Sequence, residues 1–143
     1  MSAVRRKPPA IFKPPLEKDE QQAVTRLLRL AKFRVGATSQ YRRSGQMVGL
    51  PDLVVLHCGL GRGGWWETKK YQARGFHPFD RSTWRPEPLS AKQLDFRVLA
   101  VESGQLHGWG GRREAEDWLI TIGLAVRAGN GSILLTPNGK APS

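Results

Sequence analysis

Asp52, Glu67 and Lys69 have the types and the spacing of residues that could hydrolyse a phosphate ester. They lie within GLPDLVVLHCGLGRGGWWETKK, residues 49–70, in a part of the chain where basic residues far outnumber acidic ones. Lys69 follows Glu67 by two positions, so both side chains point to the same face if this segment is a strand. If that strand pairs with the segment beginning at Asp52, two carboxylates and one ammonium group meet at one end of a sheet.

Two carboxylates held close together repel each other, and the arrangement makes chemical sense if a divalent cation lies between them. Oxygen ligands favour Mg²⁺ or Mn²⁺, which lowers the pKa of a bound water and neutralises charge on the scissile phosphate. Lys69 would then position the water and stabilise the developing negative charge. A simpler interpretation stays open, in which Pro51 and Asp52 form a turn and Glu67 and Lys69 are a surface ion pair worth ~0–1 kcal/mol.

The overall charge points to a polyanionic partner. The 143 residues include 23 Lys and Arg against 12 Asp and Glu, which gives a formal net charge of +11. Clusters of cations gain affinity for nucleic acids by releasing counterions from the phosphates. A nonspecifically adhesive surface would have the same composition, but we expect a nucleic acid.

The composition also argues against several other classes of protein. One cysteine, Cys58, allows neither an intramolecular disulfide nor a cysteine-based zinc site, and the three histidines lack zinc-hydrolase spacing. No apolar run approaches the ~20 residues of a membrane helix, so we expect no membrane partner. Residues 1–16, with four prolines and four basic residues, have no apolar signal core. We expect them to be a flexible arm, and the protein to lie in the cytoplasm.

Hydrophobic periodicity and turn residues predict one α/β domain over residues 17–124, with a mixed central sheet flanked by helices. Residues 125–143 are an extension, either a hairpin around Asn130 and Gly131 or a disordered tail. Trp65 and Trp66 are expected in the core. Arg112 and Arg113 are expected to face the solvent. The predicted elements are helices over 19–32, 90–104 and 112–123, and strands over 33–40, 51–58, 65–69 and 105–111.

The segments GLPDLVVL, WWETKK and LSAKQLDF, followed by a glycine and a short strand, closely resemble the VRR-NUC domain of the PD-(D/E)XK nuclease superfamily. The resemblance covers about residues 17–111 and implies a restriction-endonuclease-like core. It implies that Asp52, Glu67 and the backbone carbonyl of Thr68 bind the metal. It also implies that Lys69 is the catalytic lysine and that Gln93 lies beside the site.

Two of these assignments have structural alternatives. The family places a glutamate of the first helix near the metals, and Glu20 is the best match here, with Glu17 and Asp19 as alternatives. Glu20 could instead only complement the helix dipole. Gln93 is also the third helical residue after Ser90, and the two would form a capping box without any catalysis. The two interpretations of Gln93 are compatible.

Residues 70–88 form a longer link than the family uses, rich in aromatic and arginine residues. These side chains could stack on unpaired bases and contact phosphates, or pack onto the domain or a partner subunit. The candidates for nucleic-acid contacts are Arg42 and Arg43, which precede the GLPD turn, and Lys70 and Arg74, which lie in this insertion.

The resemblance implies an Mg²⁺- or Mn²⁺-dependent endodeoxyribonuclease that hydrolyses phosphodiester bonds in DNA. Stand-alone members of the family form homodimers that act on branched or junction DNA, and such small nucleases are frequent in phages and prophages. The alternative is a non-catalytic nucleic-acid-binding protein that keeps a nuclease-like fold. Binding by such a protein would be sensitive to salt and would need no metal.

Overall fold

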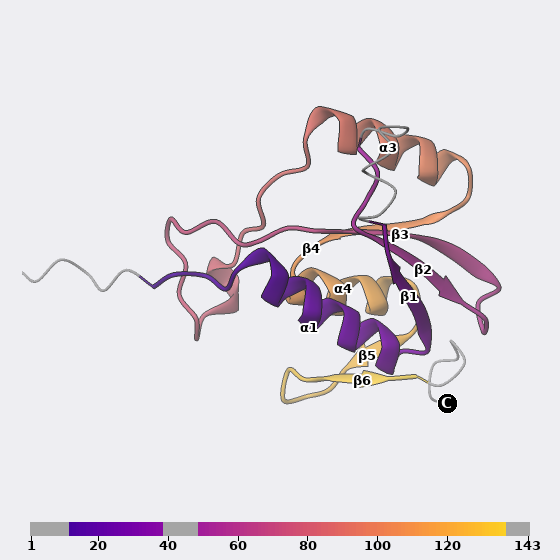
Figure 1. Cartoon of the computed structure of the whole chain (residues 1–143). Coiled ribbons are helices and arrows are strands. Elements are labelled where there is room, and N and C mark those ends of the chain that lie inside the picture. The colour runs from indigo at the N-terminus through magenta and orange to yellow at the C-terminus, as the bar shows by residue number, and fades with distance from the viewer. Residues whose placement is uncertain (1–11, 39–48, 137–143) are drawn as a thin grey trace, which may run out of the picture.

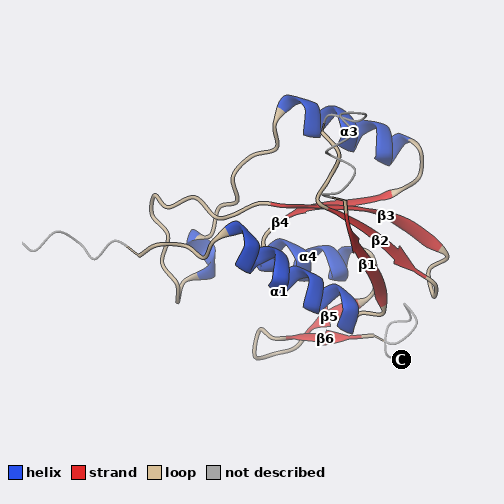
Figure 2. Ribbon diagram, in the orientation of Figure 1, coloured by secondary structure: helices blue, strands red, loops and turns tan. Residues whose placement is uncertain are grey.

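The computed structural model describes residues 12–38 and 49–136, whose elements form a layered α/β fold (Figure 1). One helix covers one face of a four-stranded sheet and two helices cover the other face, with a two-stranded hairpin beyond these two (Figure 2). The α/β class with a mixed sheet between helices is therefore confirmed. Within these two ranges, no helix is long and apolar enough to cross a membrane.

Helices α1 (Glu17–Leu30) and α4 (Arg112–Thr121) pack against each other on one face of the sheet. Val24 and Leu28 of α1 are fully buried because their four-residue spacing places them on the face toward the sheet. Acidic residues lie in the first turn of α1, where they complement the helix dipole. The predicted helix is present, with bounds two residues closer to the N-terminus.

The sheet contains strands β1 (Phe33–Ala37), β2 (Leu53–His57), β3 (Arg62–Thr68) and β4 (Leu106–Gly110), in this spatial order. Neighbours β1, β2 and β3 are antiparallel, whereas β4 runs parallel to β3. The short turn between β2 and β3 forms the predicted hairpin. Parallel pairing of β4 requires a crossover, which the chain between β3 and β4 supplies.

Helix α3 (Ala91–Glu102) lies in this crossover and covers the opposite face of the sheet from α1 and α4. The side chains of β3 alternate between the two faces. Trp65 contacts Phe96 of α3 edge to face at 5.2 Å, and Trp66 contacts Trp118 of α4 at 5.5 Å. Trp66 is fully buried, as predicted, and Trp65 is half-buried under α3. Glu67, two residues after Trp65, therefore belongs to the face covered by α3.

The insertion over 70–88 packs most of its aromatic side chains onto the domain. Tyr71 and Phe76 are buried, and the Trp84 ring lies 5.3 Å from Tyr71 and 5.8 Å from Phe76. A short 3-10 helix, η1 (Arg81–Thr83), precedes Trp84. The sequence left open whether these rings stack on bases or pack onto the protein. Tyr71, Phe76 and Trp84 pack onto the protein. Phe79 is 89% exposed and is not part of this cluster.

The C-terminal extension forms a hairpin and extends the core. Strands β5 (Ala125–Arg127) and β6 (Ile133–Leu135) pair antiparallel around the Asn130-Gly131 turn. Ala125 is buried in the core cluster, and Ile133 and Leu135 pack against it. The hairpin alternative therefore holds for residues 125–136.

Replacement of Gly64 tests the close approach of β3 and β4. A Cβ atom at this position would fall on the backbone carbonyl group of Leu106, so the two strands would have to separate. We expect Gly64→Ala to lower the free energy of unfolding by about 2–3 kcal/mol, as measured by urea unfolding. Gly129→Ala is the matched control, because nothing lies within 4 Å of its Cβ position. Equal effects of the two substitutions would contradict the close β3–β4 contact.

Candidate functional site

Asp52 and Glu67 lie side by side where β2 begins and β3 ends. The register pairs Leu53 with Trp66, which places Asp52 opposite Glu67. The Thr68 N–H donates to Asp52 Oδ2 at 2.9 Å, and the Asp52 N–H donates to Glu67 Oε2 at 3.1 Å. Each carboxylate is thus held by the backbone of the opposite strand, and the structure brings together the two acids that the sequence singled out.

The turn before Asp52 packs against the first turn of α3. Gly49 has φ +89°, and a Cβ atom there would lie 2.6 Å from the carbonyl oxygen of Lys92. Only glycine satisfies both the backbone angle and the contact. On the other side, the Thr38 N–H donates to the Asp52 carbonyl at 2.9 Å. The GLPD turn is therefore fixed between the end of β1 and the start of α3.

Gln93 acts both as a capping residue and as a partner of the acidic pair. Its Oε1 accepts from the Ser90 N–H at 2.9 Å, while its own N–H donates to Ser90 Oγ at 3.2 Å. Its Nε2 donates to Glu67 Oε1 at 2.8 Å. The capping box and the contact with the site, which the sequence left as compatible alternatives, are both present. The start of α3 therefore orients the Glu67 carboxylate.

Lys69 follows the end of β3 and is half-buried. Its backbone N–H donates to the Gly110 carbonyl at 3.0 Å, which continues the β3–β4 pairing by one residue. Strand alternation places its side chain on the same face as Glu67. Within the described ranges, no carboxylate forms an ion pair with the Lys69 ammonium group. The simple surface pair of Glu67 with Lys69 is therefore not what the structure contains.

Glu20 is fully buried and is engaged by Arg112 at the start of α4. Glu20 Oε1 accepts from the Arg112 N–H at 3.1 Å and from its Nε at 3.0 Å, and Oε2 accepts from Nη2 at 2.9 Å. These hydrogen bonds raise the pKa of the Arg112 guanidinium above its usual value. The structure therefore gives Glu20 a role in joining α1 to α4, and none of the hydrogen bonds or ion pairs of its carboxylate with the described residues involves Asp52 or Glu67. Its competitor Glu17 is exposed and Asp19 half-buried, both in the first turn of α1.

The prediction that Arg112 and Arg113 face the solvent is wrong. Both side chains are half-buried, because each guanidinium finds a partner inside the protein. Arg113 Nε donates to Glu114 at 3.1 Å, and the Arg113 N–H donates to the Tyr71 hydroxyl oxygen at 3.0 Å. The first turn of α4 is thus tied to the insertion.

The four residues predicted to contact nucleic acid differ in their surroundings. Lys70 is exposed and lies 3.8 Å from Glu87. Arg74 is exposed in the insertion, where no hydrogen bond or ion pair of its side chain is found among the described residues. Arg42 and Arg43 lie outside the described residues.

A small cavity of about 230 Å³ lies where the insertion meets the residues before α1. Tyr71 borders it, and burial together with the nearby Glu114 carboxylate raises the pKa of its phenol, which keeps Tyr71 neutral. Phe12 contacts the His77 ring at 4.8 Å, so residues 12–16 rest against the insertion. The lining residues are Lys13, Pro15, Glu20, Tyr71, Phe76, Pro78, Trp84 and Arg112.

The donor set at the end of β2 and β3 fits a small hard cation. Mg²⁺ binds through one or two carboxylates and completes its shell with water and phosphate oxygens. Asp52 and Glu67 supply two adjacent carboxylates, and the Thr68 carbonyl belongs to the next residue of β3. Within residues 12–38 and 49–136, no group of three or more His, Cys, Asp or Glu side chains could hold a metal. Water and substrate oxygens would complete the shell of a bound ion.

Arg112 is the residue of structural importance that sequence reasoning missed. Glu20 shares a four-residue row with Val24 and Leu28, and this row faces the core. The spacing could have placed the Glu20 carboxylate inside the protein and so demanded a partner for it. It could not name that partner, which lies 92 positions further along the chain.

Comparisons with protein-family models, with curated proteins and with solved structures found no significant match.

Removal of the Arg112 side chain tests the buried ion pair. Arg112→Gln leaves the fully buried Glu20 carboxylate without its cation. We expect this change to lower the free energy of unfolding by about 3 kcal/mol near neutral pH, as measured by urea unfolding. The double variant Glu20→Gln/Arg112→Gln removes both charges and should recover part of the loss. Equal stability of Arg112→Gln and the wild-type protein would contradict the pairing.

His107 lies beneath α3 and is held neutral by its surroundings. Arg97 Nη1 donates to His107 Nδ1 at 2.9 Å and to its carbonyl oxygen at 2.7 Å. Burial, followed by the positive charge of Arg97, lowers the pKa of His107 to about 4. Between this value and the ordinary 6.5, the unfolded chain binds a proton that the folded chain does not bind. The folded state is therefore penalised as the pH falls through this window.

We expect the urea midpoint of the wild-type protein to fall between pH 7.5 and pH 5 by more than that of His107→Gln. The glutamine keeps an oxygen that can accept from Arg97 and has no titrating ring, so the difference between the two proteins isolates His107. The carboxylates contribute equally to both profiles. Parallel profiles would contradict the low pKa of His107.

Proposed function

We propose that this protein is a metal-dependent DNA endonuclease of the VRR-NUC type with a restriction-endonuclease-like core. The observation that carries the proposal is the chain of hydrogen bonds that joins Thr68, Asp52, Glu67 and Gln93 at one end of the sheet. These residues come from two strands and a helix, and they are the ones that the VRR-NUC resemblance singles out. The formal charge of +11 supports a nucleic acid as the substrate.

Asp52 and Glu67, with the Thr68 carbonyl, would hold Mg²⁺ or Mn²⁺. When bound there, the ion would acidify a water molecule and neutralise charge on the phosphate. Both carboxylates are already oriented by backbone N–H groups and by Gln93, so little rearrangement is needed when substrate arrives. Burial of Glu67, which is 3% exposed, limits its alternative conformations.

Lys69 would be the catalytic lysine in this proposal. Its side chain shares a face with Glu67, and its ammonium group is not consumed by a described carboxylate. In the proposed reaction a water oxygen bonds to phosphorus while the bond to the leaving oxygen breaks, and the leaving oxygen takes up a proton. Lys69 would orient the water and stabilise the negative charge that builds on the phosphate.

Substrate recognition in this proposal relies on the DNA backbone and on its shape. The exposed Arg74 and Lys70, in the insertion that follows β3, would contact phosphates without reading bases. Selectivity for branched DNA would follow if a homodimer presents two sites to the arms of one junction. This part of the proposal rests on the resemblance to stand-alone VRR-NUC proteins.

A cleavage assay tests the proposed activity. Labelled four-way junction, flap, duplex and single-stranded DNA are incubated with the protein and Mg²⁺, Mn²⁺ or EDTA. We expect metal-dependent cutting by the wild-type protein and a loss of at least about 10²-fold in Asp52→Asn and in Lys69→Ala. Asp95→Asn is a matched control, because Asp95 is an exposed residue on α3 outside the site, and it should cut normally.

The assay also distinguishes the alternative function. A folded wild-type protein that binds DNA but cuts none of these substrates with either metal would contradict the nuclease. Unchanged DNA binding by Asp52→Asn and Lys69→Ala would then identify a non-catalytic binding protein. Equal cutting by wild type and both variants would point to a contaminating nuclease.

A further inference from the structure

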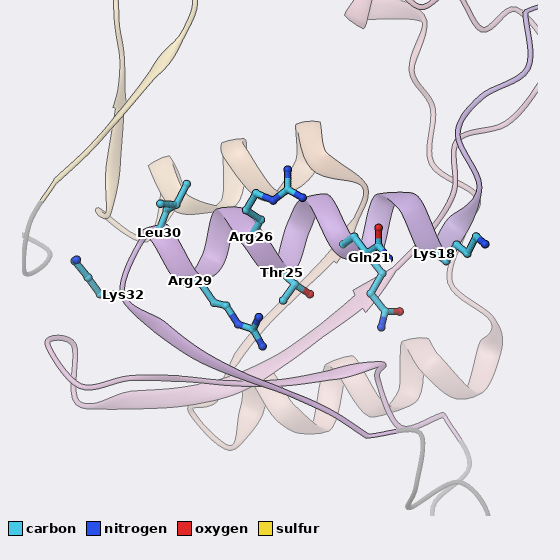
Figure 3. A pocket seen from close by; sticks show the side chains of 8 residues that line it. Lys18, Gln21, Thr25, Arg26, Arg29, Leu30 and Lys32 are labelled. Atoms are coloured by element: carbon cyan, nitrogen blue, oxygen red, sulfur yellow. The ribbon is translucent and has the colours of Figure 1, made fainter.

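A shallow groove of about 660 Å³ follows the outer side of α1 (Figure 3). Two rows of side chains at four-residue spacing form its ridges, as expected for neighbouring rows on a helix. One row contains Lys18, Gln22, Arg26 and Leu30, and the other contains Gln21, Thr25 and Arg29, with Lys32 beyond the helix end. Val24 and Leu28 point instead into the core. We call this surface the α1 groove.

The cations of the α1 groove differ from most other arginines in the described ranges because they have no partner inside the protein. Lys18, Arg26, Arg29 and Lys32 form no side-chain hydrogen bond or ion pair with the described residues. Elsewhere the arginine side chains are mostly engaged. Those of Arg62, Arg81, Arg97, Arg112, Arg113 and Arg127 each bond to another residue of the chain. The α1 groove thus contains several cationic side chains that form no hydrogen bond or ion pair with the described residues.

The helix dipole explains only part of this charge. Cations in the last turn of a helix stabilise it, which accounts for Arg29. Lys18 lies in the first turn, where a cation is unfavourable, and Arg26 lies one turn before the end. The polar neighbours Gln21, Gln22 and Thr25 add uncharged donors between the cations. Lysine, arginine, glutamine and threonine are the side chains that contact phosphate and sugar oxygens.

The α1 groove and the acidic pair lie on different sides of the molecule. Gln93 of α3 contacts Glu67 on one face of the sheet, whereas α1 covers the opposite face. The α1 residues that line the groove are positions other than the fully buried Val24 and Leu28. From Lys18 to Lys32 the groove spans about 20 Å at the rise of an α-helix. A phosphate bound in the α1 groove would therefore lie on the other side of the sheet from a phosphate that meets Asp52 and Glu67.

We propose that the α1 groove binds the sugar-phosphate backbone of nucleic acid at a segment outside the one that reacts. The position relative to the reacting segment rests on the proposed nuclease function, whereas the binding itself does not. The groove adds affinity and salt dependence, and it leaves the chemical step unchanged. Its cations act together over several phosphates of one backbone.

The test measures DNA binding without cleavage. Binding of a labelled 30-base-pair duplex is followed by fluorescence anisotropy in EDTA at several salt concentrations. The groove variant Arg26→Gln/Arg29→Gln removes two cations, so its plot of log K against log salt should be shallower by about 1.8. We expect its affinity at low salt to fall about tenfold. If the wild-type protein cleaves DNA, kcat at saturating DNA should stay the same.

A second variant, which loses the same number of positive charges outside the α1 groove, controls for the change in net charge. Arg62→Gln/Arg127→Gln also removes two cations, and both of these arginines are bonded within the protein, to Gly104 and Asp117. We expect it to bind with the wild-type salt slope, and thermal melting checks that both variants fold. An unchanged slope in the groove variant, or an equal decrease in both variants, would overturn the proposal. If the wild-type protein cleaves no DNA, the proposed nuclease activity is contradicted but the proposed binding by the α1 groove is not. The binding measurement does not depend on cleavage.

Discussion

The antiparallel pairing of β2 with β3 is the constraint on which the rest of the site depends. Its register brings the start of one strand to the end of the other, so Asp52 and Glu67 meet although 15 positions separate them. The backbone of each strand then donates to the carboxylate of the other. A shift of one residue would turn these side chains to opposite faces. The large rings of Trp65 and Trp66, each packed under a different layer, make such a shift costly.

Helix α3 couples this hairpin to the second half of the chain. Its capping box begins the helix, and the same glutamine reaches across to Glu67. Close contact of Gly49 with the Lys92 carbonyl fixes the turn before Asp52 against the helix as well. The geometry of the acidic pair is therefore determined by a helix start as much as by the strands. A single residue serves helix stability and site orientation together.

Electrostatics divides the cations into two groups. One group neutralises buried or half-buried acids and carbonyls, and the pairing of Arg112 with the fully buried Glu20 joins α1 to α4. Among the described residues, a second group has no hydrogen-bond or ion-pair partner for its side chains. It includes Lys18, Arg26, Arg29 and Lys32 on the outer side of α1, and Arg74 in the insertion, all of which could meet an external polyanion. Some of the cationic side chains therefore stabilise the fold through internal hydrogen bonds and ion pairs. The remainder defines where a nucleic acid would be attracted.

The sequence by itself determined the local features. Spacing of apolar residues and turn chemistry predicted α1, the β2–β3 hairpin and the Ser90 cap, because each depends on residues close together in the chain. The hairpin around Asn130 was one of two alternatives for the C-terminal extension, beside a disordered tail. The convergence of Asp52 and Glu67 was also foreseeable, since a hairpin fixes it.

Only the tertiary structure decided which distant groups meet. Glu20 forms an ion pair with Arg112, and the aromatic insertion packs back onto the domain. These contacts join elements brought together by the packing of α1 and α4 on one face of the sheet. Their partners are chosen by packing in three dimensions, about which spacing along the chain carries no information.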